Sequence, residues 1–254
     1  MTRSVSGSSI SQQPQNNNNA AASSSSSSSS WNPESAVPLE IKQLLIPKQT
    51  TSSSYSYILA FHQILDLLKS QKRTGWLNHN ISNPESISDH MYRMSIIAMS
   101  LNSSNFPENN NEKLDLSKCV KISLIHDIAE ALVGDIVPHD TTVNKEEKNK
   151  REYNTILYMS QLIKNYNPIF AQEIIESWLD YEEQRNFEAK IVKDIDKYEL
   201  LLSAFHYERE YKGEKDLSEF FSARELIKTQ EIAKIADELL KERDLFWRNI
   251  KKIN

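Results

Sequence analysis

Beyond residue 50, apolar side chains recur every three or four residues along most of the chain, with polar side chains between them. This period of about 3.6 residues is typical of amphipathic helices, whereas half-buried strands alternate strictly between apolar and polar side chains. The chain has four glycines and few alternating runs of β-branched residues. The pattern therefore predicts an all-α fold, a single compact helical bundle. The predicted helices cover residues 55–70, 86–101, 116–133, 145–164, 168–184, 187–211 and much of 216–250.

Specific signals mark the ends of two of these helices. Ser86 and Asp89 form a capping-box pattern, which predicts a helix start at this point. Gly134 can adopt the left-handed backbone that ends a helix. One turn after the predicted cap, His90 lies on the same face as Met94, so we expect this histidine to point toward the core.

The N-terminal part of the chain differs from the rest in composition. Residues 1–30 are dominated by asparagine, alanine and serine, and such a tract cannot bury enough apolar surface to offset the entropy of ordering. Three prolines extend the tail to about residue 50. We therefore expect a disordered tail over residues 1–50 and one domain over residues 51–254. Trp31 and residues 44–46 are potential docking points.

Charge and hydropathy exclude several classes of partner. The formal net charge of −5 provides no broad attraction for nucleic-acid backbones. The chain has no apolar run of about 18 residues and no signal-peptide core, so neither a membrane span nor secretion is expected. Its one cysteine, Cys119, cannot build a disulfide framework and lies in an apolar segment. We expect a soluble cytoplasmic protein that acts on a small polar molecule.

The chemistry concentrates in residues 122–133, ISLIHDIAEALV, a segment that is apolar nearly all round a helix. Its ionisable residues are His126, Asp127 and Glu130. An unpaired buried carboxylate costs several kcal/mol, so this group needs a compensating partner, and a metal cation supplies one. His126 and Asp127 lie about 100° apart around a helix, and Glu130 follows His126 by one turn on the same face.

Other helices can complete a metal site. His90 adds a second imidazole, and the helix over residues 191–202, with Asp194 and Asp196, adds a carboxylate. Periodicity does not decide which of these two aspartates faces the site, because each lies at the edge of the apolar stripe. A His-Asp pair alone is more often a satisfied pair in the core than a metal site, but three separated segments in this order favour a metal. Imidazole and carboxylate ligands suit Mn²⁺, Co²⁺, Fe²⁺ or Zn²⁺ and tolerate Mg²⁺, so we expect one divalent ion per chain.

The order of these residues resembles the H…HD…D signature of the HD-domain superfamily of metal-dependent phosphohydrolases. Longer segments are similar to the HD-domain 5′-deoxynucleotidases, including the eukaryotic HD-domain-containing protein 2 group. They are RTGW (73–76), PESISDHMYRM (84–94), HDIAEALVGDI (126–136) and KEEKNKRE (145–152). The resemblance covers about residues 55–245. Its Lys-x-x-Asp pattern selects Asp196 and leaves Asp194 as a solvated helix residue.

The resemblance also implies a role for each site residue. The implied metal ligands are His90, His126, Asp127 and Asp196. Glu130 resembles the acid/base residue, Asp135 the group that holds the sugar hydroxyl, and Arg73 the phosphate contact. Trp76 resembles the aromatic residue that packs against deoxyribose and disfavours a 2′-hydroxyl. Two residues separate Arg73 from Trp76, where bacterial members have an Arg-Trp dipeptide, so hydrolysis is implied more directly than deoxyribose selectivity.

The expected activity is metal-dependent hydrolysis of nucleoside 5′-monophosphates, especially 2′-deoxyribonucleoside 5′-monophosphates, by a homodimer. The alternatives are hydrolysis of nucleoside triphosphates or guanosine tetraphosphate, and a non-catalytic HD module that binds nucleotides. A short chain argues against the first alternative, and the retained ligands and Glu130 argue against the second. The run over residues 145–152 is interpreted as a solvated helix start, with the alternative that its lysines approach a phosphate after the loop over residues 135–142, and it is assigned no catalytic role.

Overall fold

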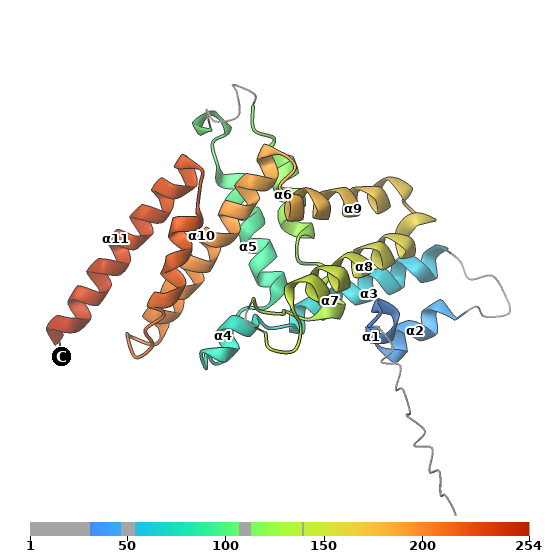
Figure 1. The fold of residues 1–254 in the computed structure, drawn as a ribbon, viewed down its shortest axis with the longest axis horizontal. Coiled ribbons are helices and arrows are strands. Elements are labelled where there is room, and N and C mark those ends of the chain that lie inside the picture. The colour runs from blue at the N-terminus through green and yellow to red at the C-terminus, as the bar shows by residue number, and fades with distance from the viewer. Residues whose placement is uncertain (1–30, 47–53, 107–112, 139, 254) are drawn as a thin grey trace, which may run out of the picture. The chain divides into compact units, whose positions relative to one another are not determined.

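The computed structural model describes residues 31–46, 54–106, 113–138 and 140–253, so the tail predicted over residues 1–30 lies outside the described residues. The described part of the chain is helical without strands, which confirms the predicted all-α fold (Figure 1). The α-helices are α1 (Pro33–Ala36), α2 (Leu39–Leu45), α3 (Ser54–Ser70), α4 (Thr74–Asn78), α5 (Ile87–Ser100), α6 (Leu116–Ile125), α7 (Glu130–Val133), α8 (Lys145–Lys164), α9 (Pro168–Glu183), α10 (Phe187–Glu210) and α11 (Gln230–Ile253). Two 3₁₀ helices are η1 (Ser103–Asn105) and η2 (Ser218–Leu226).

The start of α5 follows from its cap. The Ser86 hydroxyl oxygen accepts the backbone N–H of Asp89 at 3.1 Å, and the Asp89 carboxylate accepts the backbone N–H of Ser86 at 2.8 Å. Both halves of the predicted capping box are therefore present, and two N–H groups that the helix leaves unpaired are satisfied. This cap sets the register that turns His90 inward, where its side chain is fully buried.

The helix predicted over residues 116–133 is wrong in one respect, because it breaks in the middle. α6 ends at Ile125, and α7 begins only at Glu130. Between them the backbone forms tighter three-residue turns, in which the N–H of Glu130 donates to the carbonyl oxygen of Asp127 at 3.0 Å. Gly134, with a φ of 84°, ends α7 as predicted. The break lies at the His-Asp pair, so these two side chains project from a turn rather than from a continuous helix.

The N-terminal segment corrects a second expectation. Residues 31–46 were expected in a disordered tail, but they form α1 and α2, which pack against α3, α7 and α8. Val37 and Ile41 are buried, each with 3% of its surface exposed. Val37 lies in the extended link between α1 and α2, and Ile41 lies on α2, so both the link and the second helix contribute to the core. The folded unit therefore begins at Trp31 rather than near residue 51.

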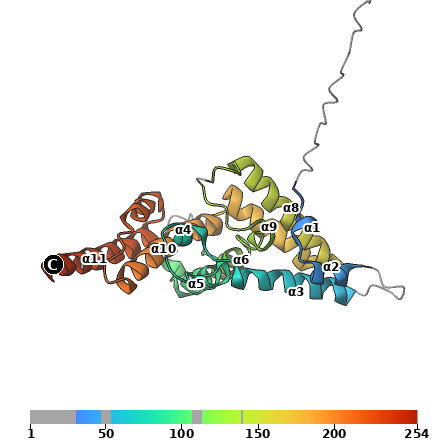
Figure 2. The same cartoon turned by 90° about the horizontal axis from the view of Figure 1, so that it is seen from below.

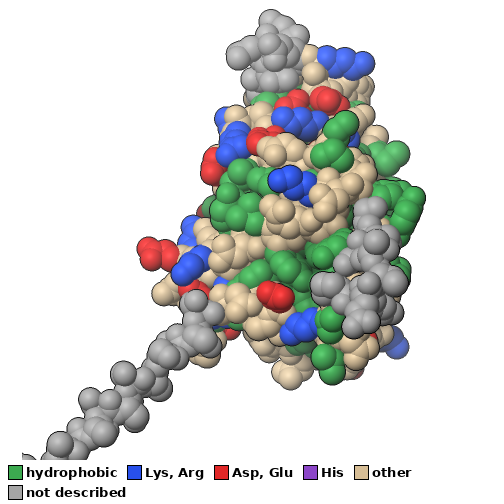
Figure 3. Space-filling model, turned by 90° about the vertical axis from the view of Figure 1, so that its right-hand side faces the viewer, with side chains coloured by type: hydrophobic (Ala, Val, Ile, Leu, Met, Phe, Trp, Pro, Cys, Tyr) green, Lys and Arg blue, Asp and Glu red, His purple; other side chains and the backbone are tan. Residues whose placement is uncertain are grey.

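The two larger apolar clusters of the core share α5 and α6. One joins these helices to α3, α8 and α9, and the other joins them to α10 and α11. A smaller cluster surrounds Trp76. Figures 1 and 2 show α5 and α6 between the α3, α8 and α9 group and the α10 and α11 group. At the end formed by α2 and the starts of α3 and α9, apolar side chains reach the surface between charged ones (Figure 3). Among the described residues, no helix combines the length and apolarity that a membrane crossing requires.

Candidate active site

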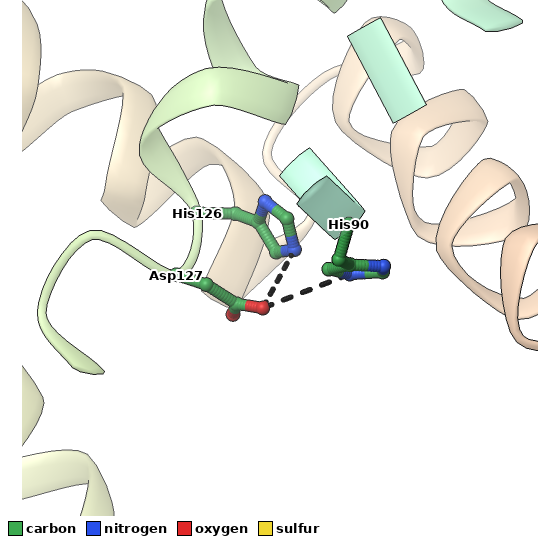
Figure 4. A group of neighbouring side chains, drawn as sticks. All are labelled: His90, His126 and Asp127. Atoms are coloured by element: carbon green, nitrogen blue, oxygen red, sulfur yellow. Dashed lines mark ion pairs between the residues drawn. The ribbon is translucent and has the colours of Figure 1, made fainter. Parts of the chain in front are cut away.

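Three predicted metal ligands meet between the two core clusters. His90 comes from α5, and His126 and Asp127 come from the break between α6 and α7 (Figure 4). Their potential ligand atoms all lie within 4.8 Å of one another. Asp127 Oδ2 lies 3.1 Å from His126 Nε2 and 3.7 Å from His90 Nε2. This spacing leaves room for one ion that all three side chains can reach.

The hydrogen bonds of both imidazoles orient the rings toward this point. His90 Nδ1 lies 2.7 Å from Glu199 Oε2, and His126 Nδ1 lies 2.9 Å from the carbonyl oxygen of Ser123. Because both acceptors take an N–H from Nδ1, the lone pair of each neutral ring is on Nε2. Both Nε2 atoms are buried without a hydrogen-bond partner. Two such nitrogens beside a carboxylate fit a divalent metal ion.

The structure brings Asp196, rather than Asp194, to this cluster. Asp196 Oδ1 lies 3.4 Å from His90 Nε2, and its Oδ2 accepts the hydroxyl hydrogen of Tyr181 at 2.8 Å. Asp194 is not the solvated residue that the sequence suggests. It is buried and accepts the backbone N–H groups of Lys228 and Thr229, where it caps the start of α11.

The cluster opens into a cleft of about 620 Å³, a size that fits a small-molecule ligand. Seven predicted site residues line it: Arg73, Trp76, His126, Asp127, Glu130, Asp135 and Asp196. His90 lies behind the cleft wall. Six apolar residues also line the cleft: Ile136, Val137, Pro138, Val143, Leu200 and Phe220. The part of the cleft at His126, Asp127 and Asp196 is called its ionic end, and the apolar lining residues can contact an apolar or aromatic group.

Glu130 and Asp127 have opposite electrostatic environments. Burial and the negative charges of Asp127 and Asp135 raise the pKa of the Glu130 carboxyl well above its usual value. Burial alone would also raise the pKa of Asp127, but the positive charges that His126 and His90 carry in their protonated forms, together with the charge of Arg73, hold it well below its usual value. Glu130 Oε2 is buried without a hydrogen-bond partner. The cleft thus contains one carboxyl that favours the protonated form and one that stays ionised.

The segment around Arg73 and Trp76 closes the cleft from the side of α4. Arg73 Nη1 lies 3.5 Å from Asp127 Oδ2. Thr74, one of the two residues that separate Arg73 from Trp76, donates its backbone N–H to Asp135 Oδ2 at 2.5 Å and its hydroxyl to the Asp135 carbonyl at 2.7 Å. Thr74 thus ties this segment to Asp135. Trp76 has 1% of its surface exposed and packs against Phe220 at 4.6 Å between ring centroids.

One face of α8 also reaches the cleft. The sequence left open that lysines of residues 145–152 approach a phosphate, but the interpretation missed that Asn149 and Glu152 lie on the same face. The lining residues from this helix are Lys145, Lys148, Asn149 and Glu152. Their three- and four-residue spacing places them on one helix face, a signal that the sequence contains. Lys148 Nζ donates to the carbonyl of Ile136 at 2.9 Å and lies 3.9 Å from Glu130 Oε1. Glu199 was also missed, although a lone glutamate in the apolar run YELLL indicates a buried partner.

Comparison with known proteins agrees with this geometry. A family profile described as HD domain matches residues 65–236. The chain is 47% identical to the Saccharomyces cerevisiae protein named 5′-deoxynucleotidase YBR242W, over 87% of each chain. It is 37% identical to the human protein named 5′-deoxynucleotidase HDDC2, over 73% of this chain and 86% of that one. A solved structure of the HD domain-containing protein YGK1 matches with a TM-score of 0.65 and 38% identity, over 86% of this chain and 100% of that one.

Proposed function

The chain belongs to the HD-domain family, and on this premise we propose that it hydrolyses nucleoside 5′-monophosphates, preferentially 2′-deoxyribonucleoside 5′-monophosphates, to nucleoside and phosphate. The observation that carries this proposal is the pair of unpartnered imidazole nitrogens beside Asp127 at the ionic end of the cleft. The relatives named 5′-deoxynucleotidase support the same activity.

The proposed metal ligands are His90, His126, Asp127 and Asp196. Two imidazole nitrogens and two carboxylate oxygens suit a divalent ion of borderline softness, with Mn²⁺, Co²⁺, Fe²⁺, Zn²⁺ and Mg²⁺ as candidates. Such an ion supplies positive charge that polarises a phosphoryl group and makes water a better nucleophile. The remaining chemistry belongs to the side chains of the chain itself.

Arg73 and Glu130 are the proposed groups that act on the phosphate. The Arg73 guanidinium lies beside Asp127, so a phosphate at the ionic end of the cleft meets a fixed positive charge. Glu130 lines the same end and favours its protonated form, which suits donation of a proton to the departing 5′-oxygen. Its carboxylate form can accept a proton from the attacking water in the same turnover.

Asp135 and Trp76 are the proposed contacts to the sugar. Asp135 is oriented by the two hydrogen bonds from Thr74, so its remaining acceptor capacity can serve a sugar hydroxyl. Trp76 forms part of the cleft wall beside Phe220. Its indole is rigid and packs on that ring, so it cannot move aside for a larger sugar. A rigid wall at the sugar favours the smaller deoxyribose over ribose.

The test is phosphate release from a panel of nucleoside mono-, di- and triphosphates, after chelation and with each candidate ion added singly. We expect no release after chelation, recovery with a divalent ion, and the highest kcat/KM for deoxyribonucleoside monophosphates. Four lysines line the cleft, Lys145, Lys148, Lys193 and Lys197, so longer phosphate chains belong in the panel. Preferred turnover of a triphosphate, or nucleotide binding without turnover, would contradict the proposal.

We also propose that the protein is a homodimer. The outward face of α5 carries Tyr92, Ile96 and Met99, which are 66%, 46% and 63% exposed. Their spacing aligns them in one apolar stripe that a second copy can cover. Light scattering should give twice the chain mass, and Ile96→Glu should shift it toward one chain mass. Leu226→Glu, at a similarly exposed apolar residue in η2, is the matched control and should leave the mass unchanged.

A further inference from the structure

A network of charged side chains lies behind the cleft wall, between α5 and α10. Arg93 Nε donates to Glu199 Oε1 at 2.7 Å, and Arg93 Nη2 donates to Glu85 Oε2 at 2.8 Å. The side chains of Glu85 and Glu199 are 9% and 0% exposed. None of the three residues lines the cleft. Glu85, Glu199 and His90 are close enough to hold a cation, but the guanidinium of Arg93 already pairs with both carboxylates.

Each end of this network holds a residue of the proposed site. At one end, Glu199 Oε2 lies 2.7 Å from His90 Nδ1 and so orients a proposed metal ligand. At the other end, Glu85 Oε1 accepts the indole N–H of Trp76 at 3.0 Å. The backbone carbonyl of Glu85 also accepts the N–H of Arg73 at 3.2 Å. The same group of side chains, in which Glu199 is fully buried and Arg93 is 37% exposed, therefore supports the metal side and the sugar side of the cleft.

The hydrogen bonds of the network are mutually dependent. Each carboxylate oxygen of Glu85 and Glu199 faces an N–H donor, and the rigid fork of Arg93 joins the two groups. Two buried carboxylates that share one arginine repel each other if that arginine shifts. The Ser203 hydroxyl belongs to the same network, because its Oγ lies 3.0 Å from Glu85 Oε1 and 3.4 Å from Glu199 Oε1. A change at one end redistributes these shared hydrogen bonds and moves the arginine, so it alters the other end.

We propose that Glu85, Arg93 and Glu199 are positioning residues that join His90 and Trp76 into one unit, so that metal affinity and sugar selectivity are coupled. The expected effect on sugar selectivity rests on the proposed function. The expected effect on metal affinity rests only on the ligand geometry and can be measured without turnover.

The decisive measurement is the Mn²⁺ affinity of Glu85→Gln, determined by competition with a chelator. Glu85 makes no hydrogen bond to His90, but its carboxylate lies within 4.8 Å of that imidazole and can act on it through its charge. The charge-neutral variant Trp76→Phe therefore accompanies it, because independent supports would leave the Mn²⁺ affinity of that variant unchanged. A joined network should weaken it at least about threefold, within the range measured for residues that share a hydrogen-bond network. Glu199→Gln, which acts on His90 directly, should weaken it about 10- to 100-fold. An unchanged Mn²⁺ affinity in folded Glu85→Gln would overturn the coupling.

Two further variants protect this measurement from a folding artefact. Trp76→Phe removes the indole N–H that Glu85 accepts and changes no charge, and it should also weaken Mn²⁺ binding if the network is a unit. It also shrinks the ring that packs against Phe220, so its fold is checked by the same measurements as that of the other variants. This variant decides the question alone if Glu85→Gln does not fold. Glu210→Gln changes a half-exposed glutamate on α10 and is the matched control, with unchanged Mn²⁺ affinity expected. Circular dichroism and the thermal midpoint establish that each variant is folded.

The second readout is the ratio of kcat/KM for deoxyribonucleoside over ribonucleoside monophosphates. Glu199→Gln should lower this ratio, although Glu199 lies outside the cleft. If this kcat/KM ratio is unchanged in Glu199→Gln at saturating metal, Glu199 supports only the metal ligand, and the proposed coupling is overturned. Absence of phosphate release from the unsubstituted protein would instead reject the proposed function, and the Mn²⁺ measurement would still decide whether the network is joined.

Discussion

Glu130 is the residue at which a loss of catalysis can be distinguished most clearly from a loss of metal binding. It lines the cleft and has one unpaired oxygen, yet it is not among the three side chains that converge on the ion. We predict that Glu130→Gln keeps the bound metal while the single-turnover rate falls by about 10²- to 10⁴-fold, the usual range for a lost general acid or base. Elemental analysis and rapid-quench kinetics on one preparation measure both quantities. A rate restored by excess metal would show that Glu130 only supports a ligand.

Glu152 on α8 supplies a prediction about pH. Burial raises the pKa of this carboxyl from 4.5 to about 7, and the opposing charge of Lys148 at 3.5 Å does not reverse the shift. The unfolded chain therefore releases this proton at lower pH than the folded chain, so the contribution of Glu152 to stability declines as pH rises from 4.5 to about 7.

Glu152→Gln removes this penalty. Urea unfolding should show the variant more stable than the unsubstituted protein by about 1 to 3 kcal/mol at pH 8, and equal to it near the acid end of that window. Glu146→Gln, an exposed residue on the same helix, is the control and should show no such pH dependence. Equal stability of Glu152→Gln and the unsubstituted protein at pH 8 would contradict the assignment.

At the scale of elements, the short N-terminal helices belong to the domain. α1 packs against α7, which begins with Glu130, and against α8, which carries Lys148. We predict that Ile41→Ala, at a residue that is 3% exposed, lowers the free energy of unfolding by about 2 to 4 kcal/mol. Leu39→Ala, on the same helix but 69% exposed, should cost less than about 0.5 kcal/mol. Similar costs for both variants in urea unfolding would mean that α2 does not dock.

The break between α6 and α7 is the element that shapes the site. A continuous helix would have separated His126 from Asp127 by about 100° around one axis. The turns at residues 126–129 instead bring Asp127 Oδ2 to 3.1 Å from His126 Nε2. Both side chains can therefore approach one ion without distortion of a helix.

At the scale of the whole molecule, metal binding should be linked to folding. The proposed ligands come from α5, the α6–α7 break and α10, which meet only in the folded chain. An ion that binds the folded state alone at 100 times its Kd adds about 2.7 kcal/mol to the free energy of unfolding. We predict that chelation lowers the thermal midpoint, that Mn²⁺ restores it, and that His126→Ala abolishes the response. A midpoint insensitive to metal in the unsubstituted protein would remove this site from the proposal.

Local patterns in the sequence determined the fold class and most helix ends. The capping box at Ser86 and the span of α8 follow from hydrogen bonding and periodicity within a few residues, so no knowledge of distant contacts is needed. The motif residues could be identified for the same reason, because His90, His126 and Asp127 occur in recognisable segments.

The tertiary structure decided what depends on the packing of one helix against another. Asp194 and Asp196 lie at equivalent edges of the apolar stripe of α10. Only the position of α11 decides that Asp194 accepts the N–H groups before that helix, while Asp196 lies beside His90. The same holds for the cleft-facing side of α8 and for the docking of residues 31–46. Periodicity shows which face of a helix is apolar, but which partner that face meets is a long-range property, because it depends on how all the helices fill the core together.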